Sequence, residues 1–173
     1  MQTPAVAPRW LWLLWALAAA TPVAAAAQSV SGRVLSIADG DTIRVRQGER
    51  AITVRLACID APESAQSPWG LQALHDLRQR LPIGREVTLI IKTSDRNGRT
   101  VAEVIADINI NLVMVEDGRA FVDRRDLNGC DARAYLDAEF RASRHRFGVW
   151  QLEGGITRPW DFRRGPGAQR SRS

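Results

Sequence analysis

Alternating apolar and polar residues predict five short β-strands in this chain. Charged and apolar side chains alternate at residues 43–46 and again at Val54-Arg55-Leu56, as in strands buried on one face. Turn signals such as Asp39-Gly40-Asp41 separate these stretches. The predicted strands cover residues 29–37, 42–46, 52–59, 87–91 and 101–105. The first three follow one another with only turns between them, which favours an antiparallel meander.

A second period, with apolar residues three or four positions apart, predicts three helices. The first covers residues 67–81 with a stripe of four leucines, and the others cover 111–116 and 131–146. Residues 120–125 are expected to be extended or irregular, and those from 158 onward extended or disordered. Three strands, a helix, two strands and then helices is the order expected of a five-stranded OB barrel. The predicted fold class is therefore α+β, mainly β, with three helices around the barrel.

The first 27 residues have the features of a secretory signal peptide. Arg9 precedes an apolar core of about ten residues, and small residues follow as far as Ala27. Pro22 and this small-residue tail argue against a permanent membrane helix, which needs about 20 apolar residues. We expect cleavage near Ala26 or Ala27, with an uncleaved anchor as the alternative. The protein should then be exported, periplasmic or secreted, without stable membrane association after cleavage.

Charge divides the rest of the chain into a neutral body and a basic tail. Without Arg9 the chain carries 23 Lys and Arg against 19 Asp and Glu, a net charge of +4. Residues 158–173 hold five arginines against Asp161 alone, which is also +4. The pI of about 10.4 therefore reflects the tail and is no evidence for a basic face on the domain. We expect a monomer with one domain at 28–157 and a flexible tail at 158–173.

Few residues of the kinds that bind zinc are present. His75 and His145 are the only histidines, which disfavours a zinc site or a Ser-His-Asp triad. Cys58 and Cys130 are the only cysteines. In an exported chain they could form one disulfide or remain two buried thiols. The chemistry of this chain is therefore expected to depend on carboxylates and arginines.

Candidate chemistry gathers at the end of the third predicted strand. Proline has no N–H and fixes its own φ, so the strand must stop at Ala61-Pro62, with Asp60 and Glu63 at its end. Arg55 precedes Asp60 by five residues, so on a regular strand the two side chains would point to opposite faces. A twist or bulge could bring them to one rim. Two carboxylates beside a guanidinium could hold a hard cation and a phosphate, and the alternative is a solvated strand end.

Four segments together resemble the thermonuclease family, whose members contain a staphylococcal-nuclease-like domain. They occur in the family's order and near its spacing across residues 31–150: Asp39-Gly40-Asp41-Thr42, residues 55–63, Asp95-Arg96-Asn97-Gly98-Arg99 and Gly148-Val149-Trp150. The resemblance implies an OB barrel with three helices. It also implies an endonuclease-type phosphodiesterase that hydrolyses DNA or RNA with Ca²⁺ as cofactor.

The resemblance assigns a metal site to three residues. Asp41 and Asp60 would bind Ca²⁺ through their carboxylates, and the backbone carbonyl of Ala61 would be a further ligand. Calcium prefers oxygen ligands of this kind, completed by water.

The resemblance also assigns roles in cleavage to three residues. Glu63 would act as general base or orient the attacking water, while Arg55 and Arg99 would hold the scissile phosphate. Two forked guanidiniums suit this task because they stabilise the negative charge that develops on phosphate oxygens.

One segment departs from the family's pattern. Phe121-Val122-Asp123-Arg124-Arg125-Asp126 carries acids where the family tends to carry tyrosines near the nucleotide. Lost stacking and added repulsion predict weaker substrate binding, unless this loop points away from the substrate.

Two functions remain open at this point. The first is a secreted or periplasmic Ca²⁺-dependent nuclease. The second is a non-catalytic OB module that binds nucleic acid or protein. A non-catalytic copy should have lost part of the set Asp41, Arg55, Asp60, Glu63 and Arg99, and none of these is lost.

Overall fold

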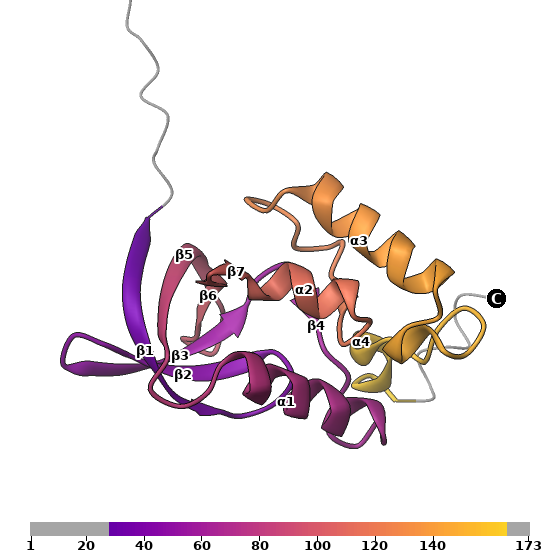
Figure 1. Ribbon diagram of the computed structural model, residues 1–173, viewed down its shortest axis with the longest axis horizontal. Helices are drawn as coiled ribbons and strands as arrows, with labels where there is room; N and C mark the ends of the chain where they lie inside the picture. Colours follow the sequence, from indigo (N-terminus) through magenta and orange to yellow (C-terminus); the bar gives the residue numbers. More distant parts are fainter. Residues whose placement is uncertain (1–27, 166–173) are drawn as a thin grey trace, which may run out of the picture.

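The computed structural model describes residues 28 to 165, and its elements follow the predicted order closely (Figure 1). The strands are β1 (Ser29–Ile37), β2 (Thr42–Gln47), β3 (Arg50–Leu56), β4 (Ile59–Asp60), β5 (Glu86–Ser94), β6 (Thr100–Ala106), β7 (Ile108–Asn109) and β8 (Phe121–Val122). The helices are α1 (Trp69–Arg80), α2 (Ile110–Glu116), α3 (Ala132–Arg144), the 3₁₀ turn η1 (Gly148–Trp150) and α4 (Pro159–Phe162).

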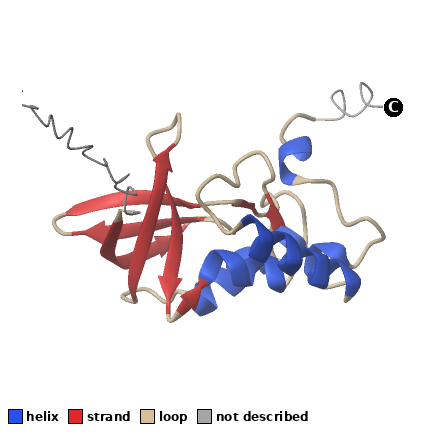
Figure 2. Cartoon of the chain, turned by 90° about the horizontal axis from the view of Figure 1, so that it is seen from above, coloured by secondary structure: helices blue, strands red, loops and turns tan. Residues whose placement is uncertain are grey.

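Five strands close into a barrel, which confirms the predicted OB-type fold. The sheet order is β3-β2-β1-β5-β6-β7, and parallel pairing between β3 and β6 closes it. Neighbouring strands in the β1–β2–β3 meander are antiparallel, with Thr42 opposite Arg55. Figure 2 shows the strands of the barrel on one side of the molecule and the helices on the other.

The alternation in the sequence places apolar side chains inside the barrel. Val34, Ile43, Val45, Val54 and Leu89 are all fully buried. The residues between them on the strands face outward, which is the usual consequence of the two-residue period of a strand. This core fixes the ends of β2 and β3, from which candidate site residues project.

The third predicted strand is shorter than expected. Residues 52–59 were expected to form one strand, but β3 ends at Leu56, and the separate strand β4 pairs with β8. Cys58 lies between them with φ of 67°, a left-handed conformation that a continuous strand cannot contain. The chain therefore bends at residues 57–58, immediately before Asp60.

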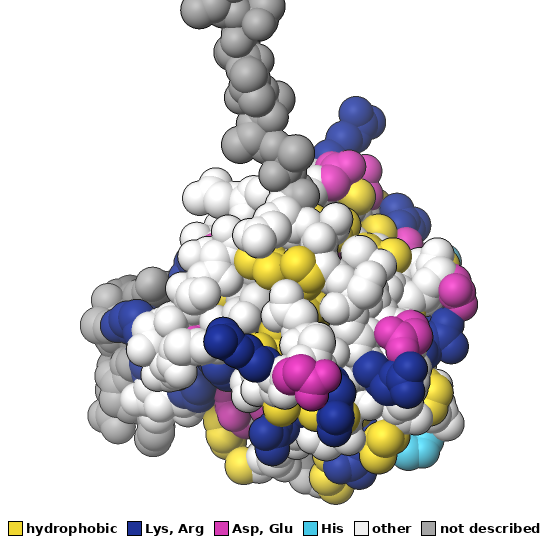
Figure 3. All heavy atoms as spheres, turned by 90° about the vertical axis from the view of Figure 1, so that its left-hand side faces the viewer, with side chains coloured by type: hydrophobic (Ala, Val, Ile, Leu, Met, Phe, Trp, Pro, Cys, Tyr) yellow, Lys and Arg dark blue, Asp and Glu magenta, His cyan; other side chains and the backbone are white. Residues whose placement is uncertain are grey.

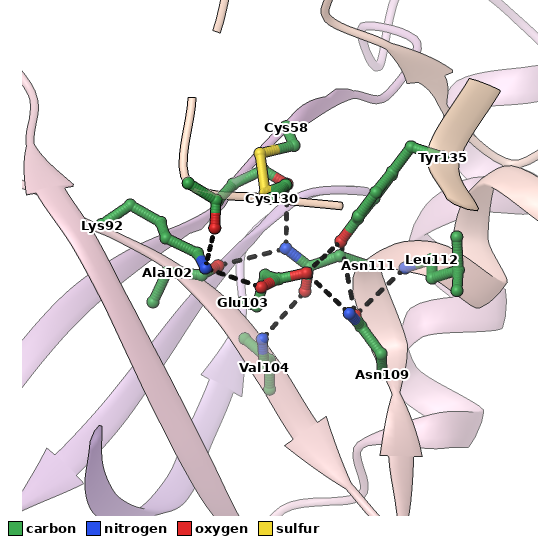
Figure 4. The surroundings of a disulfide bond; sticks show 12 residues. Cys58, Lys92, Ala102, Glu103, Val104, Asn109, Asn111, Leu112, Cys130 and Tyr135 are labelled. Atoms are coloured by element: carbon green, nitrogen blue, oxygen red, sulfur yellow. Dashed lines mark hydrogen bonds and ion pairs between the residues drawn. A yellow bond between two sulfur atoms is a disulfide. The ribbon is translucent and has the colours of Figure 1, made fainter. Parts of the chain in front are cut away.

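A disulfide and a buried amide hold this bend (Figure 4). The structure joins Cys58 to Cys130, across 72 residues of chain, and a loop of that size is worth about 4 kcal/mol in the chain-entropy model. Asn111 is fully buried, and its amide donates to the carbonyls of Ala57 and Ala102 at 2.9 and 3.1 Å. The bend is thus tied to α2 and to the closing strand β6.

The C-terminal element, residues 158–165, is more ordered than the sequence predicted. An extended or disordered segment was expected, but Pro159–Phe162 forms α4, with proline at its first turn. A second apolar cluster anchors it, formed by Phe121, Ala142, Val149, Trp150 and Ile156, with Trp69 and Trp160 packed against them. The predicted signal peptide and residues 166–173 lie outside the described residues.

On the face that Figure 3 shows, basic and acidic side chains are interspersed and neither kind forms a large patch. Within residues 28–165, no helix is both long and apolar enough to cross a membrane.

Candidate active site

A cavity of about 800 Å³ opens at the strand ends where the predicted site residues lie. Its lining comes from the β1–β2 turn, the end of β3, the segment after β4, the β5–β6 hairpin, the segment after β8 and the C-terminal element. Four of the five predicted charged site residues line it: Asp41, Arg55, Glu63 and Arg99. The fifth, Asp60, lies beneath this surface with a fully buried side chain.

The Asp39-Gly40-Asp41 turn presents the first carboxylate. Asp39 Oδ1 accepts a hydrogen bond from the Asp41 N–H at 3.0 Å, which fixes the turn. A Cβ on Gly40 would lie 2.7 Å from the Cβ of Ala61, so glycine is needed for this close approach. Asp41 Oδ2 accepts from the Ala61 N–H at 2.9 Å. Burial raises the pKa of Asp41 to about 7, although Arg55 acts in the opposite direction.

The bend after β3 brings Arg55 and Asp60 together. Arg55 donates to Asp41 Oδ1 at 2.9 Å and to Asp60 Oδ1 at 3.0 Å. The two carboxylates therefore share one guanidinium, although a continuous strand would have placed Arg55 and Asp60 on opposite faces. The bend at residues 57–58 provides the irregularity that the sequence pattern required.

Glu63 stands at the open side of the same group. Its N–H donates to Gln66 Oε1 at 3.0 Å, and Gln66 in turn donates to the Thr157 carbonyl at 2.8 Å. The backbone of α1 approaches closely here, since a Cβ on Gly70 would lie 2.2 Å from the Glu63 carbonyl oxygen. The Glu63 carboxylate pairs with Arg163. Its side chain is only partly exposed and faces the cavity.

Arg99 lies across the cavity in the β5–β6 hairpin and is paired locally. Its Nε donates to Asp95 Oδ2 at 2.6 Å, and Asp95 Oδ1 accepts from the backbone N–H groups of Asn97 and Arg99. Burial alone would raise the pKa of Asp95, but the hydrogen bonds from Arg99 and Asn97 hold it below its ordinary value. Asp95 thus stays charged and orients Arg99, a role that the sequence did not suggest.

Of the two acids after β8, Asp123 is buried and Asp126 is exposed. Asp123 accepts from the Arg125 side chain at 2.8 and 2.6 Å, so its charge is paired within the loop. Burial would raise the pKa of Asp123, but these bonds from Arg125 outweigh it and lower the pKa. Asp123, Arg125 and Asp126 all line the cavity, so this loop does not point away from it.

The C-terminal element contributes residues that sequence reasoning missed. Arg163 donates to Asp60 Oδ1 at 3.1 Å and to Asp60 Oδ2 at 2.5 Å. These bonds raise the pKa of Arg163, so its guanidinium stays charged. Trp160 also lines the cavity, with the Arg125 guanidinium 4.9 Å from its ring centroid. The one local signal was the sequence Pro-Trp-Asp-Phe, in which proline opens a helix and aromatic residues can pack.

The donor set suits a hard cation, but it is small. Asp41 and Asp60 offer carboxylate oxygens, which a hard cation prefers, and the positive guanidinium of Arg55 already lies between them. Among residues 28–165, no group of three or more His, Cys, Asp and Glu side chains is arranged to hold a metal ion. The two aspartates therefore fit a metal only together with backbone oxygens or water. Ala61, the predicted backbone ligand, is buried beside Asp41.

Comparison with known proteins identifies the family. The model of a family described as "Staphylococcal nuclease homologue" matches residues 53–152, more than half of the chain. The chain belongs to the staphylococcal nuclease family. Its similarity to a micrococcal nuclease of Shigella flexneri is 39% identity over 143 residues, 77% of this chain and 80% of that protein. An uncharacterized endonuclease of Escherichia coli O157:H7 is 34% identical over 136 residues, 78% of this chain and 85% of that protein.

Family membership confirms the resemblance drawn from the four sequence segments. The matched range includes Arg55, Asp60, Glu63 and Arg99, but begins after Asp41. The C-terminal element lies beyond it, so Arg163 and Trp160 are features of this chain that the family match does not cover.

Proposed function

We propose that this protein is an exported, Ca²⁺-dependent nuclease that hydrolyses phosphodiester bonds of DNA, RNA or both. At the coarser level the chain is a hydrolytic nuclease of the staphylococcal nuclease family. The calcium requirement and the export are the parts that need experiment.

One observation carries the proposal. Asp41, Arg55, Glu63 and Arg99 come from four separate segments, yet all four line a single cavity above Asp60. A non-catalytic OB module has no need to keep an aspartate, a glutamate and two arginines around one cavity with a second aspartate beneath it. The complete set therefore favours catalysis over the alternative of a binding module.

The arginines are suited to hold the scissile phosphate. Arg99 is oriented by Asp95, and Arg55 is oriented by two aspartates, so both guanidiniums are held in place before substrate arrives. Such preorganised donors stabilise the charge that develops on phosphate oxygens during attack by water. A lysine would supply only a point charge and would fit two oxygens less well.

Glu63 is the candidate to accept the proton of the attacking water. It is the carboxylate of the group with the greatest exposure to the cavity, whereas Asp41 and Asp60 are buried. A base must reach the attacking water directly, which favours Glu63 as general base or as the residue that orients the water. Asp41, Asp60 and the backbone near Ala61 would hold the cation, which neutralises phosphate charge when bound.

Export is proposed from the sequence of the first 27 residues, with its single arginine, apolar core and small residues near Ala26. Amino-terminal sequencing of the protein recovered from a secreting host tests this. A mature chain that begins near residue 28 would support it, and a retained leader would contradict it.

Cleavage assays on plasmid DNA and on RNA test the activity itself. Purified protein is incubated with Ca²⁺, with Ca²⁺ plus chelator, and with Mg²⁺. We expect cleavage of at least one substrate with Ca²⁺, none in chelator, and little with Mg²⁺, which sheds water reluctantly. Strong cleavage in chelator would contradict the metal dependence. Binding of nucleic acid without cleavage under any of these conditions would favour the non-catalytic module.

A further inference from the structure

The carboxylate of Asp60 is enclosed by guanidinium groups. Oδ1 accepts from Arg55 at 3.0 Å and from Arg163 at 3.1 Å, and Oδ2 accepts from Arg163 at 2.5 Å. Arg125 Nη2 lies 3.9 Å from Oδ2. The Asp60 side chain has no exposed surface. Both of its oxygens therefore already have cationic partners, and a divalent ion can reach them only if one partner leaves.

The partner that can leave is Arg163 rather than Arg55. Arg55 lies within β3, paired with β2 on one side and β6 on the other, and its side chain is 20% exposed. Arg163 directly follows the four-residue helix α4, and its side chain is 43% exposed. Moving Arg55 would disturb the barrel, whereas moving Arg163 requires only a rotation of its side chain or a shift of α4.

Arg163 is nevertheless positioned by specific contacts of the C-terminal element. The Arg158 guanidinium lies over the rings of Phe121 and Trp150, with 4.2 and 4.6 Å to their centroids. Pro159 is buried, and Trp160 packs edge-on against Phe121 with 6.3 Å between ring centroids. These contacts stabilise α4 on the domain independently of Asp60. They present the guanidinium to Asp60 and Glu63 at high effective concentration.

We propose that Arg163 is a built-in competitor of the divalent cation. It pairs with Asp60 and Glu63 in the metal-free protein and leaves the Asp60 carboxylate when a cation binds there. The C-terminal element thereby lowers the affinity of the site for metal, and metal binding in turn loosens the element. The inference rests on the proposed function, because it assumes that Asp60 is a metal ligand.

Charge and geometry both support exclusion of one cation by the other. A guanidinium that donates to both oxygens of a carboxylate occupies the directions from which a metal would approach it. Arg55 already supplies one positive charge to Asp60, so a divalent ion added beside Arg163 would raise the repulsion among these cations, and little water screens it at a buried carboxylate. Coupling of this kind is reciprocal, so metal binding weakens the Arg163–Asp60 pair by the same factor by which the pair weakens metal binding.

Isothermal titration of the metal-free protein with Ca²⁺ tests the proposal. Arg163→Gln removes the competing charge, and Arg163→Lys keeps the charge but loses the fork. Arg164→Gln is the matched control, because Arg164 also lines the cavity but pairs with Asp161. We expect the Kd for Ca²⁺ to fall at least about tenfold in Arg163→Gln, given the strength of charge-assisted hydrogen bonds. It should fall less in Arg163→Lys and stay within about twofold in Arg164→Gln.

Hydrogen exchange gives a second readout that does not involve activity. In the wild-type protein, Ca²⁺ should speed amide exchange in residues 158–165, because the element loses its contact with Asp60. In Arg163→Gln these amides should already exchange faster and should not respond to Ca²⁺.

The outcomes separate this inference from the proposed function. Equal or weaker Ca²⁺ binding in Arg163→Gln, with measurable binding in the wild type, would overturn the inference and leave the calcium dependence in place. Absence of Ca²⁺ binding in all of the proteins would overturn both. Binding that appears only when Arg163 is replaced would support the inference.

Discussion

Arg55 and Arg163 hold the same carboxylate from two regions that are built differently. Arg55 is carried by the barrel, where strands pair on both sides and the bend after β3 is tied by a disulfide. Arg163 is carried by the C-terminal element, whose short helix is held by aromatic packing over a few residues. Both donate to Asp60 at hydrogen-bond distance. Arg55 therefore reaches Asp60 from a rigid barrel, and Arg163 makes similar contacts from a short segment that is held locally.

Arg55 and Arg163 make similar contacts with Asp60, but their different supports suit them to different functions. A group whose support is part of the core can stay in place through a reaction cycle, which suits the binding of a transition state. A group on a small satellite cluster can move at little cost, which suits exchange with a cation. Substitution of Arg55 should therefore lower the rate of cleavage, whereas substitution of Arg163 should change the affinity for the cation.

The largest effect is expected on the barrel side, at Arg55. Arg55→Gln should lower kcat by about 10²–10³, because a preorganised donor to the phosphate is lost. It should also lower the melting temperature, because Asp41 keeps a buried carboxylate without its ion-pair partner. Arg44→Gln, an exposed residue on the neighbouring strand, is the control and should behave as wild type. An Arg55→Gln enzyme with near-normal kcat would remove Arg55 from the site.

A smaller loss is expected from two conservative changes at the rim of the cavity. Glu63→Gln and Arg99→Lys should each lower turnover at least about tenfold, since one removes the base and the other the guanidinium fork. Circular dichroism should show an unchanged fold for both. Arg96→Lys, exposed in the same hairpin as Arg99, should leave turnover unchanged. Wild-type rates in both variants would refute the assigned roles.

The pH dependence should distinguish Asp41 from Arg163. Burial raises the pKa of folded Asp41 from 3.8 to about 7, so its carboxyl holds a proton below that pH and resists a cation. Ca²⁺ affinity should then fall by about tenfold for each pH unit below 7. Arg163→Gln should raise the affinity across this range and leave the midpoint unchanged. Calcium affinity that is independent of pH from 5 to 7 would contradict the Asp41 assignment.

The same pKa fixes the sign of a stability effect in the metal-free protein. As the pH rises from about 4 to about 7, the unfolded chain releases the Asp41 proton before the folded chain does. The contribution of Asp41 to folding stability should therefore decrease over this window, and the difference between wild type and Asp41→Asn should show this slope. Denaturant unfolding at a series of pH values measures this slope.

The smallest effect concerns local opening of the two regions. In the metal-free protein, amides of residues 158–165 should exchange at least about tenfold faster than those of β3, because only a few hydrogen bonds of α4 protect them. Exchange measured by mass spectrometry on the full mature chain gives both rates together. Equal protection would show that the C-terminal element opens only with the whole domain. It would contradict the view that Arg163 has a more mobile support than Arg55.

Much of the barrel and part of the site followed from local patterns. Alternation at Val54-Arg55-Leu56 predicted a strand, and Ala61-Pro62 predicted its end, because side-chain period and proline geometry depend only on neighbouring residues. The long-range closure of β3 on β6 followed only through the resemblance. The interruption at Cys58 was missed, since a positive φ at a cysteine depends on distant partners rather than on its neighbours.

The sequence by itself determined the elements of the barrel, the neutral body and the set of carboxylates and arginines. Tertiary structure alone decided which of these charges meet. It joined Arg55 to Asp41 across 14 residues of chain and placed Arg163 on Asp60 across 103 residues. The physical reason is that secondary structure reflects interactions between near neighbours. Ion pairs at a cavity depend on where the packed core brings the ends of separate segments.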